Sequence, residues 1–396
     1  MSEAFYQFKI DQLNGKEIAM SDFKGKAILI VNTAKGIRGF YNSCLHRGTQ
    51  LKPCASSGRT SKIRCPYHGW TWTLEGKLDE IPCDWDFPHV DWKKANLPEI
   101  HVDTWGGFVF INMSQKPQSL LDYLGVLPDH FSTWPLEERF IALHIRKILP
   151  ANWKACIEAF LEAYHVLQTH SQAINYAGDA NAQYDVFGDY VTRFIHTLAY
   201  KSPHVKEKLS EQDILDSALG SEGLTTTGKP KIKVPEGKTA REMYADNLKK
   251  NLGEAYEMDF SELSISETID SIEYHLFPNA CFFPGLSLPM VYRFRPDGMN
   301  IDSTVFDLIF MQPKPKGRNS PPPAVPYDLG VEDSYCSVPG VDIGLGKVYD
   351  QDTVNLRSQQ QGFNTSKKGA ETLGNYQEVR IRHFHQTIER FIKSHS

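Results

Sequence analysis

The chain of 396 residues carries 43 basic and 48 acidic side chains, and its net charge of −5 argues against general nucleic-acid binding. A hydrophobic fraction of 41% and a charged fraction of 23% are typical of a globular protein, and the length suffices for two domains with sizeable cores. No apolar run approaches the roughly eighteen residues of a membrane span, and no secretory leader is recognisable. Seven cysteines, an odd number, do not suggest a disulfide framework. We therefore expect a cytoplasmic protein without membrane contact.

The first part of the chain, residues 1–133, has the pattern of an all-β domain. Residues 27–32 and 39–42 are short β-rich runs on either side of a turn. Trp105–Asn112 is expected to form a buried strand that closes the domain.

Two short motifs lie inside this first domain. Cys44 and His46 form a C-x-H motif, and Cys65 and His68 form a C-x-x-H motif. Two thiolates and two imidazoles are the ligand set of a Rieske [2Fe–2S] cluster, in which the cysteines hold one iron and the histidines the other. A Cys₂His₂ zinc site uses the same residue types, although its paired cysteines usually stand two or more residues apart. The motifs favour the cluster and leave zinc as the alternative.

A proline-containing connector over residues 113–137 leads into a second domain, residues 134–396, which combines strands and helices. A polar stretch, residues 202–254, contains two expected helices at 206–219 and 239–252. The Gly-rich joint between them is interpreted either as a cover over a pocket or as a plain surface insertion. Strands are expected at residues 140–145, 273–284, 291–295 and 303–312, and a closing amphipathic helix at residues 376–392.

Residues 152–170 have a helical composition, and helical periodicity places Glu158, Glu162 and His165 on one face. His165 and His170 are five residues apart, so they would diverge by about 140° on a straight helix and converge only if the helix ends or bulges between them. Two convergent histidines beside acids suggest the 2-His-1-carboxylate site of mononuclear non-haem iron. The alternative is a helix with two ordinary core or surface histidines.

These segments resemble the catalytic (alpha) subunits of the Rieske non-haem iron ring-hydroxylating oxygenases. The resemblance rests on Asn42–Gly48, on Cys65–Trp70 and on the run from Asn152 to His170, which is similar to the metal-binding segment of that family. It implies an α+β chain, with an all-β Rieske domain followed by a helix-grip (START-like) domain built on an antiparallel sheet.

The resemblance also implies a ligand set. Cys44, His46, Cys65 and His68 would hold the cluster, and His165 and His170 would hold a mononuclear iron together with an aspartate that precedes a Q-Q-G-like run. Asp352 fits this third position best, with Asp350 in reserve; either could instead be a helix N-cap. His383 and His385, in the closing helix, are not expected to be ligands.

Two positions depart from the family pattern. Glu162 stands where the family usually has an aspartate that bridges the iron-ligand histidine of one subunit to a cluster-ligand histidine of its neighbour. Carried over, Glu162 would join His165 to His68 of an adjacent chain, with one methylene more than usual. Ala159 stands where the family often has asparagine, which removes a polar group near the metal.

The activity implied is that of a terminal oxygenase, which uses O₂ and NADH-derived electrons to dihydroxylate or monooxygenate a small molecule. Its partners would be a flavin reductase, a ferredoxin or both, and its assembly a homotrimer arranged head to tail. The alternatives are an electron-transfer protein fused to a ligand-binding domain, and a quaternary-amine monooxygenase of the same family. Basic residues near the cluster, Arg47, Lys62 and Arg64, could dock an acidic electron donor. An aromatic or apolar substrate is favoured by five residues that would also serve as ordinary core, Phe160, Leu161, Phe277, Phe282 and Phe283.

Overall fold

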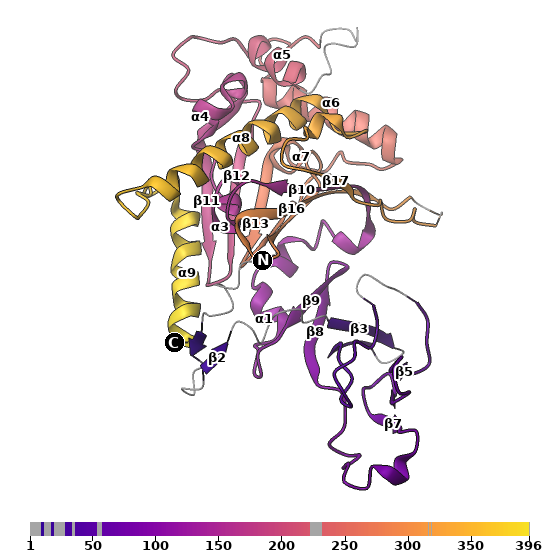
Figure 1. The fold of residues 1–396 in the computed structure, drawn as a ribbon. Helices are drawn as coiled ribbons and strands as arrows, with labels where there is room; N and C mark the ends of the chain where they lie inside the picture. Colours follow the sequence, from indigo (N-terminus) through magenta and orange to yellow (C-terminus); the bar gives the residue numbers. More distant parts are fainter. Residues whose placement is uncertain are drawn as a thin grey trace. The chain divides into compact units, whose positions relative to one another are not determined.

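The computed structural model describes residues 9–11, 17–19, 28–33, 36–53, 58–221, 232–315, 317 and 319–395 (Figure 1). Its contacts divide the chain into two compact units, Glu3–Tyr123 and Leu124–His395. The expected division at residue 133 stays a prediction. Among the described residues, no helix is both long and apolar enough to cross a membrane.

The described part of the first unit is built on short antiparallel strands, which confirms the all-β expectation. A four-stranded sheet has the order β3-β4-β8-β9, a three-stranded sheet has the order β5-β6-β7, and β1 pairs with β2. Its core centres on Trp72, which is fully buried and donates from Nε1 to the carbonyl of Ala95 at 2.9 Å. The strands are β1 Lys9–Asp11, β2 Glu17–Ala19, β3 Ile28–Thr33, β4 Gly36–Tyr41, β5 Ile63–Arg64, β6 Thr71–Trp72, β7 Leu78–Glu80, β8 Glu99–Trp105 and β9 Phe108–Asn112.

The buried strand expected over Trp105–Asn112 is wrong in two respects. Gly106 and Gly107 both have positive φ, so the segment turns there and is the second half of the β8–β9 hairpin. Val109 and Ile111 of β9 are 46% and 48% exposed. Val109 and Ile111 are two residues apart on the strand, so they share one face of the hairpin, and that face is exposed.

The second unit is organised by a mixed sheet of eight described strands, in the order β11-β12-β13-β14-β15-β16-β10-β17. All neighbours are antiparallel except β10 and β17, as expected for an antiparallel catalytic sheet. The strands predicted at residues 140–145, 273–284, 291–295 and 303–312 are confirmed, whereas β11, β12 and β17 were not predicted from the sequence. The strands of this sheet are β10 Arg139–Leu149, β11 Ala177–Phe187, β12 Val191–Leu198, β13 Ser271–Leu276, β14 Ala280–Phe282, β15 Met290–Asp297, β16 Asn300–Pro313 and β17 Tyr327–Leu329.

Helices pack on this sheet and complete the core. The short helix α3 lies against β15 and β16 and against α8, while α9 lies along β11 (Figure 1). Ile157 of α3, Leu356 of α8 and Phe384 of α9 meet Phe306 of β16 in one buried cluster. The helices are α1 Leu120–Leu124, α2 Leu127–His130, α3 Trp153–Glu158, α4 Val166–Thr169, α5 Glu211–Ser221, α6 Ala240–Tyr256, α7 Ile265–Ile269, α8 Ile343–Thr365 and α9 Val379–His395.

The two helices expected in the polar stretch are confirmed as α5 and α6, although α5 begins at Glu211 and not near residue 206. Thr239 caps α6 through a capping box with Glu242, which explains the sharp start of this helix. Most of the Gly-rich joint, residues 222–231, lies outside the described residues, so neither interpretation of it is tested.

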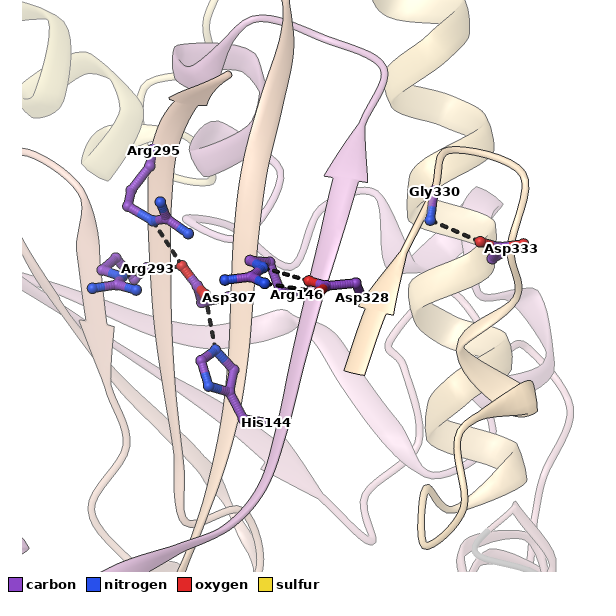
Figure 2. A network of polar contacts seen from close by, with 8 residues as sticks. All are labelled: His144, Arg146, Arg293, Arg295, Asp307, Asp328, Gly330 and Asp333. Carbon is purple, nitrogen blue, oxygen red and sulfur yellow. Dashed lines mark hydrogen bonds and ion pairs between the residues drawn. The ribbon is translucent and has the colours of Figure 1, made fainter. Parts of the chain in front are cut away.

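A polar network ties three strands of the sheet together around one buried carboxylate (Figure 2). Asp307 of β16 is fully buried; it accepts hydrogen bonds from His144 Nε2 of β10 at 2.8 Å and from Arg293 and Arg295 Nε of β15 at 3.1 and 2.9 Å. Burial alone would raise the pKa of Asp307, but these donors hold the pKa well below its usual range. The carboxylate therefore stabilises the folded sheet in its ionised form.

Replacing Asp307 with Asn is expected to lower the free energy of unfolding by about 2 kcal/mol at pH 7, because the three donors lose their charged acceptor. The folded-state pKa of Asp307 lies below that of the unfolded chain. The stabilisation is therefore complete above the unfolded value of about 4, and it is lost as the pH falls toward the folded-state pKa. Urea unfolding of wild type and Asp307→Asn at several pH values should show two curves that approach each other in acid.

Asp328→Asn is the matched control. Asp328 pairs with Arg146 beside the same network, but its side chain is 65% exposed, so its loss should cost less than about 0.5 kcal/mol. An equal loss for the two variants, or a difference independent of pH, would contradict the role given to Asp307.

Candidate functional site

The two cysteine–histidine motifs form a pair of matching loops in the first unit. In each loop the amide of a glycine donates to the cysteine carbonyl, Gly48 to Cys44 at 2.9 Å and Gly69 to Cys65 at 3.2 Å. Both glycines have a φ close to +78°, in the left-handed region that disfavours other residues. The loops therefore present their two motifs in the same backbone conformation.

These loops bring the four predicted cluster residues together. Cys44 and Cys65 are both 3% exposed and adjacent, and the ring centroids of His46 and His68 are 4.6 Å apart. Burial raises the pKa of the Cys44 thiol, so only a bound metal would keep it as the thiolate. His46 Nδ1 is buried and finds no hydrogen-bond partner among the described residues. An orphaned imidazole nitrogen beside two buried thiols fits an iron–sulfur cluster.

The segment over residues 152–170 is not one helix. Helix α3 ends at Glu158, a loop spans residues 159–165, and α4 covers Val166–Thr169. α4 ends at Thr169, so a helix ends between His165 and His170 as expected, and the loop over residues 159–165 is an additional break before both. In this loop side chains take backbone partners that a helix would use: Tyr184 Oη accepts from Ala163 N at 3.0 Å, and Glu162 Oε2 accepts from His165 N at 3.0 Å.

His165 and His170, at the two ends of α4, converge on Asp352 of α8. The distances to Asp352 Oδ1 are 3.7 Å from His165 Nε2 and 3.1 Å from His170 Nε2. The centroids of the two imidazole rings lie 5.1 Å apart. Each of the three side chains offers one ligand atom, and these atoms lie within 4.8 Å of one another, close enough to hold a metal ion. Asp352 and His170 are buried, and His165 is partly buried. The three side chains therefore meet as the expected iron site requires.

Hydrogen bonds on the far side of each ring orient the imidazoles. His165 Nδ1 donates to Glu162 Oε1 at 2.6 Å, and His170 Nδ1 donates to Gln351 Oε1 at 2.8 Å. With both Nδ1 atoms used as donors, both Nε2 atoms face Asp352, where each would offer its lone pair to a bound metal ion. This is the usual arrangement of histidines that bind a metal. The donor set, two imidazoles and one carboxylate, suits non-haem iron.

The acidic neighbours of His165 determine its pKa. Burial by itself would lower the pKa of His165, but Glu162 and Asp352 together raise it to about 9. This value shows how strongly the two carboxylates attract a cation to the position of the ring. A metal ion bound there would meet the same attraction.

Asp350 and Asp352 have different surroundings. Asp350 accepts from Ser334 Oγ at 2.5 Å and from Tyr335 N at 3.0 Å, and so it fixes the loop before α8. Neither aspartate caps a helix: α8 begins earlier, and its N-cap is Asp342, which accepts from Leu345 N at 2.9 Å. The N-cap alternative is wrong, because the helix extends two turns further toward the N-terminus than the sequence indicated.

A cavity of about 230 Å³ opens onto His165 and Asp352. Its wall combines acidic side chains with the apolar residues Leu356, Leu373 and Ile381. Ala159, the position that departs from the family pattern, also lies on this wall. The acidic residues are Glu158, Glu162, Asp352, Glu371 and Glu378.

His385 is part of a second polar group on this cavity. His385 Nε2 donates to Glu158 Oε1 at 2.6 Å, with Glu371 Oε2 at 3.9 Å, and the hydrogen bond to Glu158 raises the pKa of His385. His385 is thus joined to α3 by a contact that the sequence did not indicate. His383 turns away and donates to the carbonyl of Gly188 at 2.9 Å.

The five apolar residues that favoured an aromatic substrate do not line the cavity. Leu161, Phe282 and Phe283 are 2% exposed or less, and all five belong to the core of the second unit or pack against it. The sequence could not separate core from pocket, because both need the same residue types.

Sequence reasoning missed Gln351, Tyr184 and Gln172. Gln172 Nε2 donates to Gln351 Oε1 at 3.0 Å, which fixes the amide that orients His170. The position of Gln351 next to Asp352 was the one available signal. Tyr184 gave none, because its contact with Ala163 depends on the fold.

Comparison with known proteins places the chain in a family. Residues 129–394 match the model of the ring hydroxylating alpha subunit (catalytic domain), and residues 4–91 match that of the Rieske [2Fe-2S] domain. The chain belongs to the ring-hydroxylating alpha subunit family. The family match decides for the Rieske cluster over zinc in the first domain and for a mononuclear iron in the catalytic domain.

Curated relatives are similar over part of their length. The glycine betaine monooxygenase oxygenase subunit of Pseudomonas aeruginosa (strain UCBPP-PA14) is 33% identical over 153 residues, 37% of this chain and 34% of that protein. The carnitine monooxygenase oxygenase subunit of Escherichia coli (strain K12) is 32% identical over 161 residues, 40% and 42% of the two chains. The large oxygenase component of the naphthalene 1,2-dioxygenase system of Pseudomonas fluorescens is 33% identical over 150 residues, 35% and 32%. The matches span about a third to two-fifths of these relatives.

Solved structures share the fold over nearly the whole chain. A quaternary ammonium Rieske monooxygenase in complex with L-carnitine has a TM-score of 0.56 at 17% identity, over 94% of this chain and 82% of that one. Naphthalene 1,2-dioxygenase from Rhodococcus sp. bound to indole has a TM-score of 0.54 at 17% identity, over 93% and 84%. At these identities the likeness establishes the fold.

Asp352→Asn is expected to weaken binding of the mononuclear iron by at least about 100-fold, because it removes the one carboxylate among the three converging groups. Metal analysis after dialysis against a chelator would measure this loss. The visible absorption of the cluster should not change, since its proposed ligands lie in the other unit.

Asp350→Asn is the matched control two residues away. It should keep the mononuclear iron and lose about 1 kcal/mol of stability through its contacts with Ser334 and Tyr335. Loss of the iron in Asp350→Asn, or its retention in Asp352→Asn, would overturn the assignment.

Proposed function

We propose that this protein is the terminal oxygenase component of a multicomponent Rieske oxygenase. The observation that carries this proposal is the convergence of two imidazole Nε2 atoms and one carboxylate at a cavity wall, in a chain that also pairs two cysteine–histidine loops. The assignment gives residues 1–133 the electron-relay role and residues 134–396 the catalytic role.

His165, His170 and Asp352 would hold the mononuclear iron, which when bound supplies activation of O₂. Three protein ligands leave further coordination positions free. Glu162 and Gln351 hold the Nδ1 protons of the two histidines, so both rings keep one tautomer and one orientation. The apolar wall of Leu356, Leu373 and Ile381 limits water beside these groups.

Cys44, His46, Cys65 and His68 would hold the [2Fe–2S] cluster, which when bound relays single electrons. A flavin reductase would supply these electrons from NADH, directly or through a ferredoxin. A supply of electrons from NADH would suit a cytoplasmic protein.

The assembly belongs to the same proposal. In a homotrimer arranged head to tail, Glu162 would connect His165 to His68 of the neighbouring chain. Support comes from Glu162 itself: it lies on the cavity wall, keeps 10% of its side chain exposed and already holds His165.

Two substrate classes are candidates. The expected one is an aromatic or apolar small molecule. The other is a quaternary amine, and the cavity favours it: five carboxylates give the wall a negative charge, while its aliphatic side chains suit methyl groups. Relatives named for glycine betaine and carnitine are consistent with this second class.

Reconstitution with NADH and a reductase would test the proposal and the substrate class together. Glycine betaine, carnitine and naphthalene would be compared by substrate-dependent O₂ consumption and by product analysis. Hydroxylation at an N-methyl group with release of formaldehyde would establish amine monooxygenation, whereas a cis-diol would establish the aromatic reading. An iron-replete protein that passes electrons but oxygenates none of these would favour the electron-transfer alternative.

Glu162→Gln is expected to slow turnover by about 100-fold or more while both metals stay bound, because the amide removes the charge that would couple the two centres. Rapid mixing of the reduced protein with O₂ and substrate, followed at the cluster absorption, would measure the rate of cluster oxidation.

Glu378→Gln is the control, because Glu378 lines the same cavity and its carboxylate accepts from the amide of Gly374 and not from His165. Wild-type cluster oxidation in Glu162→Gln would exclude the bridging role. Equal slowing in both variants would instead indicate a general effect of cavity charge.

A further inference from the structure

Glu162 and His165 lie in the loop over residues 159–165, and two side chains from distant elements hold its backbone. Arg380 Nη1 of α9 donates to the carbonyl of Leu161 at 3.2 Å, and Tyr184 Oη of β11 accepts from the amide of Ala163 at 3.0 Å. These two contacts stand directly before and directly after Glu162. The loop is therefore anchored on both sides of the residue that orients His165.

Arg380 links this loop to the sheet. Its guanidinium is fully buried; it donates from Nη2 to Glu273 Oε1 of β13 at 2.7 Å and from Nε to Thr192 Oγ1 of β12 at 3.0 Å. It also lies over the ring of Phe194, 5.3 Å from the centroid. A buried charge that is fully hydrogen-bonded has little freedom to move. The Leu161 carbonyl thus has a rigid partner.

Tyr184 reaches the start of the same helix. Its hydroxyl accepts from Ala163 N and donates to Gln377 Oε1 at 3.2 Å, two residues before α9 begins. The Tyr184 side chain is buried, at 8% exposure for the residue. Both anchors of the loop therefore lead to the start of α9, one at Gln377 just before the helix and one at Arg380 in its first turn.

The two anchored groups are ones that a continuous helix would use itself. In such a helix Ala163 N would donate to the carbonyl of Ala159, and the carbonyl of Leu161 would accept from His165 N. Here Tyr184 and Arg380 replace those partners, and His165 N turns to Glu162 Oε2.

We propose that Tyr184 and Arg380 are positioning residues for the metal site. They hold residues 159–165 out of helical conformation, and this directs Glu162 toward His165 Nδ1 and His165 Nε2 toward Asp352. The inference rests on the proposed role of His165 as an iron ligand.

Tyr184→Phe tests this with one atom removed, and Tyr376→Phe is its matched control. Tyr376 packs against Tyr184, with ring centroids 5.3 Å apart, and donates its hydroxyl to the carbonyl of Ala182 at 3.0 Å without touching the loop. Each variant loses one tyrosine hydroxyl bonded to the backbone. Similar effects on the unfolding midpoint are expected for both.

Two readouts on the full-length protein separate positioning from plain stability. Hydrogen exchange of a peptide that includes Ala163 needs no metal, and we expect it to be about tenfold faster in Tyr184→Phe and unchanged in Tyr376→Phe. Affinity for the mononuclear iron, measured by chelator competition, should fall about 10- to 100-fold in Tyr184→Phe only. The cluster absorption should be equal in both.

Unchanged exchange or unchanged iron affinity in Tyr184→Phe would overturn the inference, as would equal losses of iron in the two variants. If the wild-type protein binds no mononuclear iron, the proposed function fails, and the exchange experiment still decides whether Tyr184 holds the loop. Arg380→Lys is a second variant, which keeps a positive charge opposite Glu273 and gives up the planar fork that reaches Leu161. It should accelerate exchange in the same peptide.

Discussion

The buried carboxylate of Asp352 approaches two imidazoles at once, and this contact connects the parts of the catalytic unit. Its oxygen lies 3.1 and 3.7 Å from two nitrogens that belong to a different segment, about 180 residues earlier in the chain. A carboxylate held in such a place is costly unless a cation or hydrogen bonds compensate its charge. A metal ion between the three groups would provide that compensation. The packing of α8 on α3 and α4 serves to bring these groups together.

Two sets of buried polar contacts hold the parts of the catalytic unit in fixed positions. Asp307 joins the strands β10, β15 and β16, whose inner residues form the core against which α3 packs. Arg380 and Tyr184 then join the start of α9 to the loop that carries Glu162. Both sets are built on buried polar groups that make their hydrogen bonds within the protein. Such groups define the positions of side chains more closely than apolar packing alone, and a metal site requires accurately placed ligand atoms.

The sequence revealed those parts of the site that are local in the chain. Each cluster motif lies within one loop, and His165 and His170 lie within one segment, so spacing alone indicated their chemistry. Asp352 was predicted from the resemblance to the family, and the helix that contains it was predicted to begin too far along the chain. Its true N-cap, Asp342, is an aspartate like the two considered. The residue type alone does not show whether an aspartate caps a helix or binds a metal, because both roles use the same carboxylate.

What the sequence could not show depends on contacts between distant residues. The partner of His170 Nδ1 lies 181 positions away, and that of the Leu161 carbonyl lies 219 positions away. The position of the break after α3 has the same origin, since local propensity favours a continuous helix and tertiary hydrogen bonds prevent it. The exposure of Val109 and Ile111 on β9 likewise depends on which face of the hairpin the fold covers, which an apolar run does not encode.

Electron paramagnetic resonance of the anaerobically reduced protein, recorded with and without nitric oxide, would show whether the chain holds both a Rieske cluster and a mononuclear iron. We expect a Rieske signal in both samples and, with nitric oxide, a high-spin iron–nitrosyl signal that disappears in His165→Ala while the Rieske signal remains. A Rieske signal alone, in wild-type protein replete with iron, would contradict this expectation. That result would leave an electron carrier in which His165, His170 and Asp352 converge without binding iron.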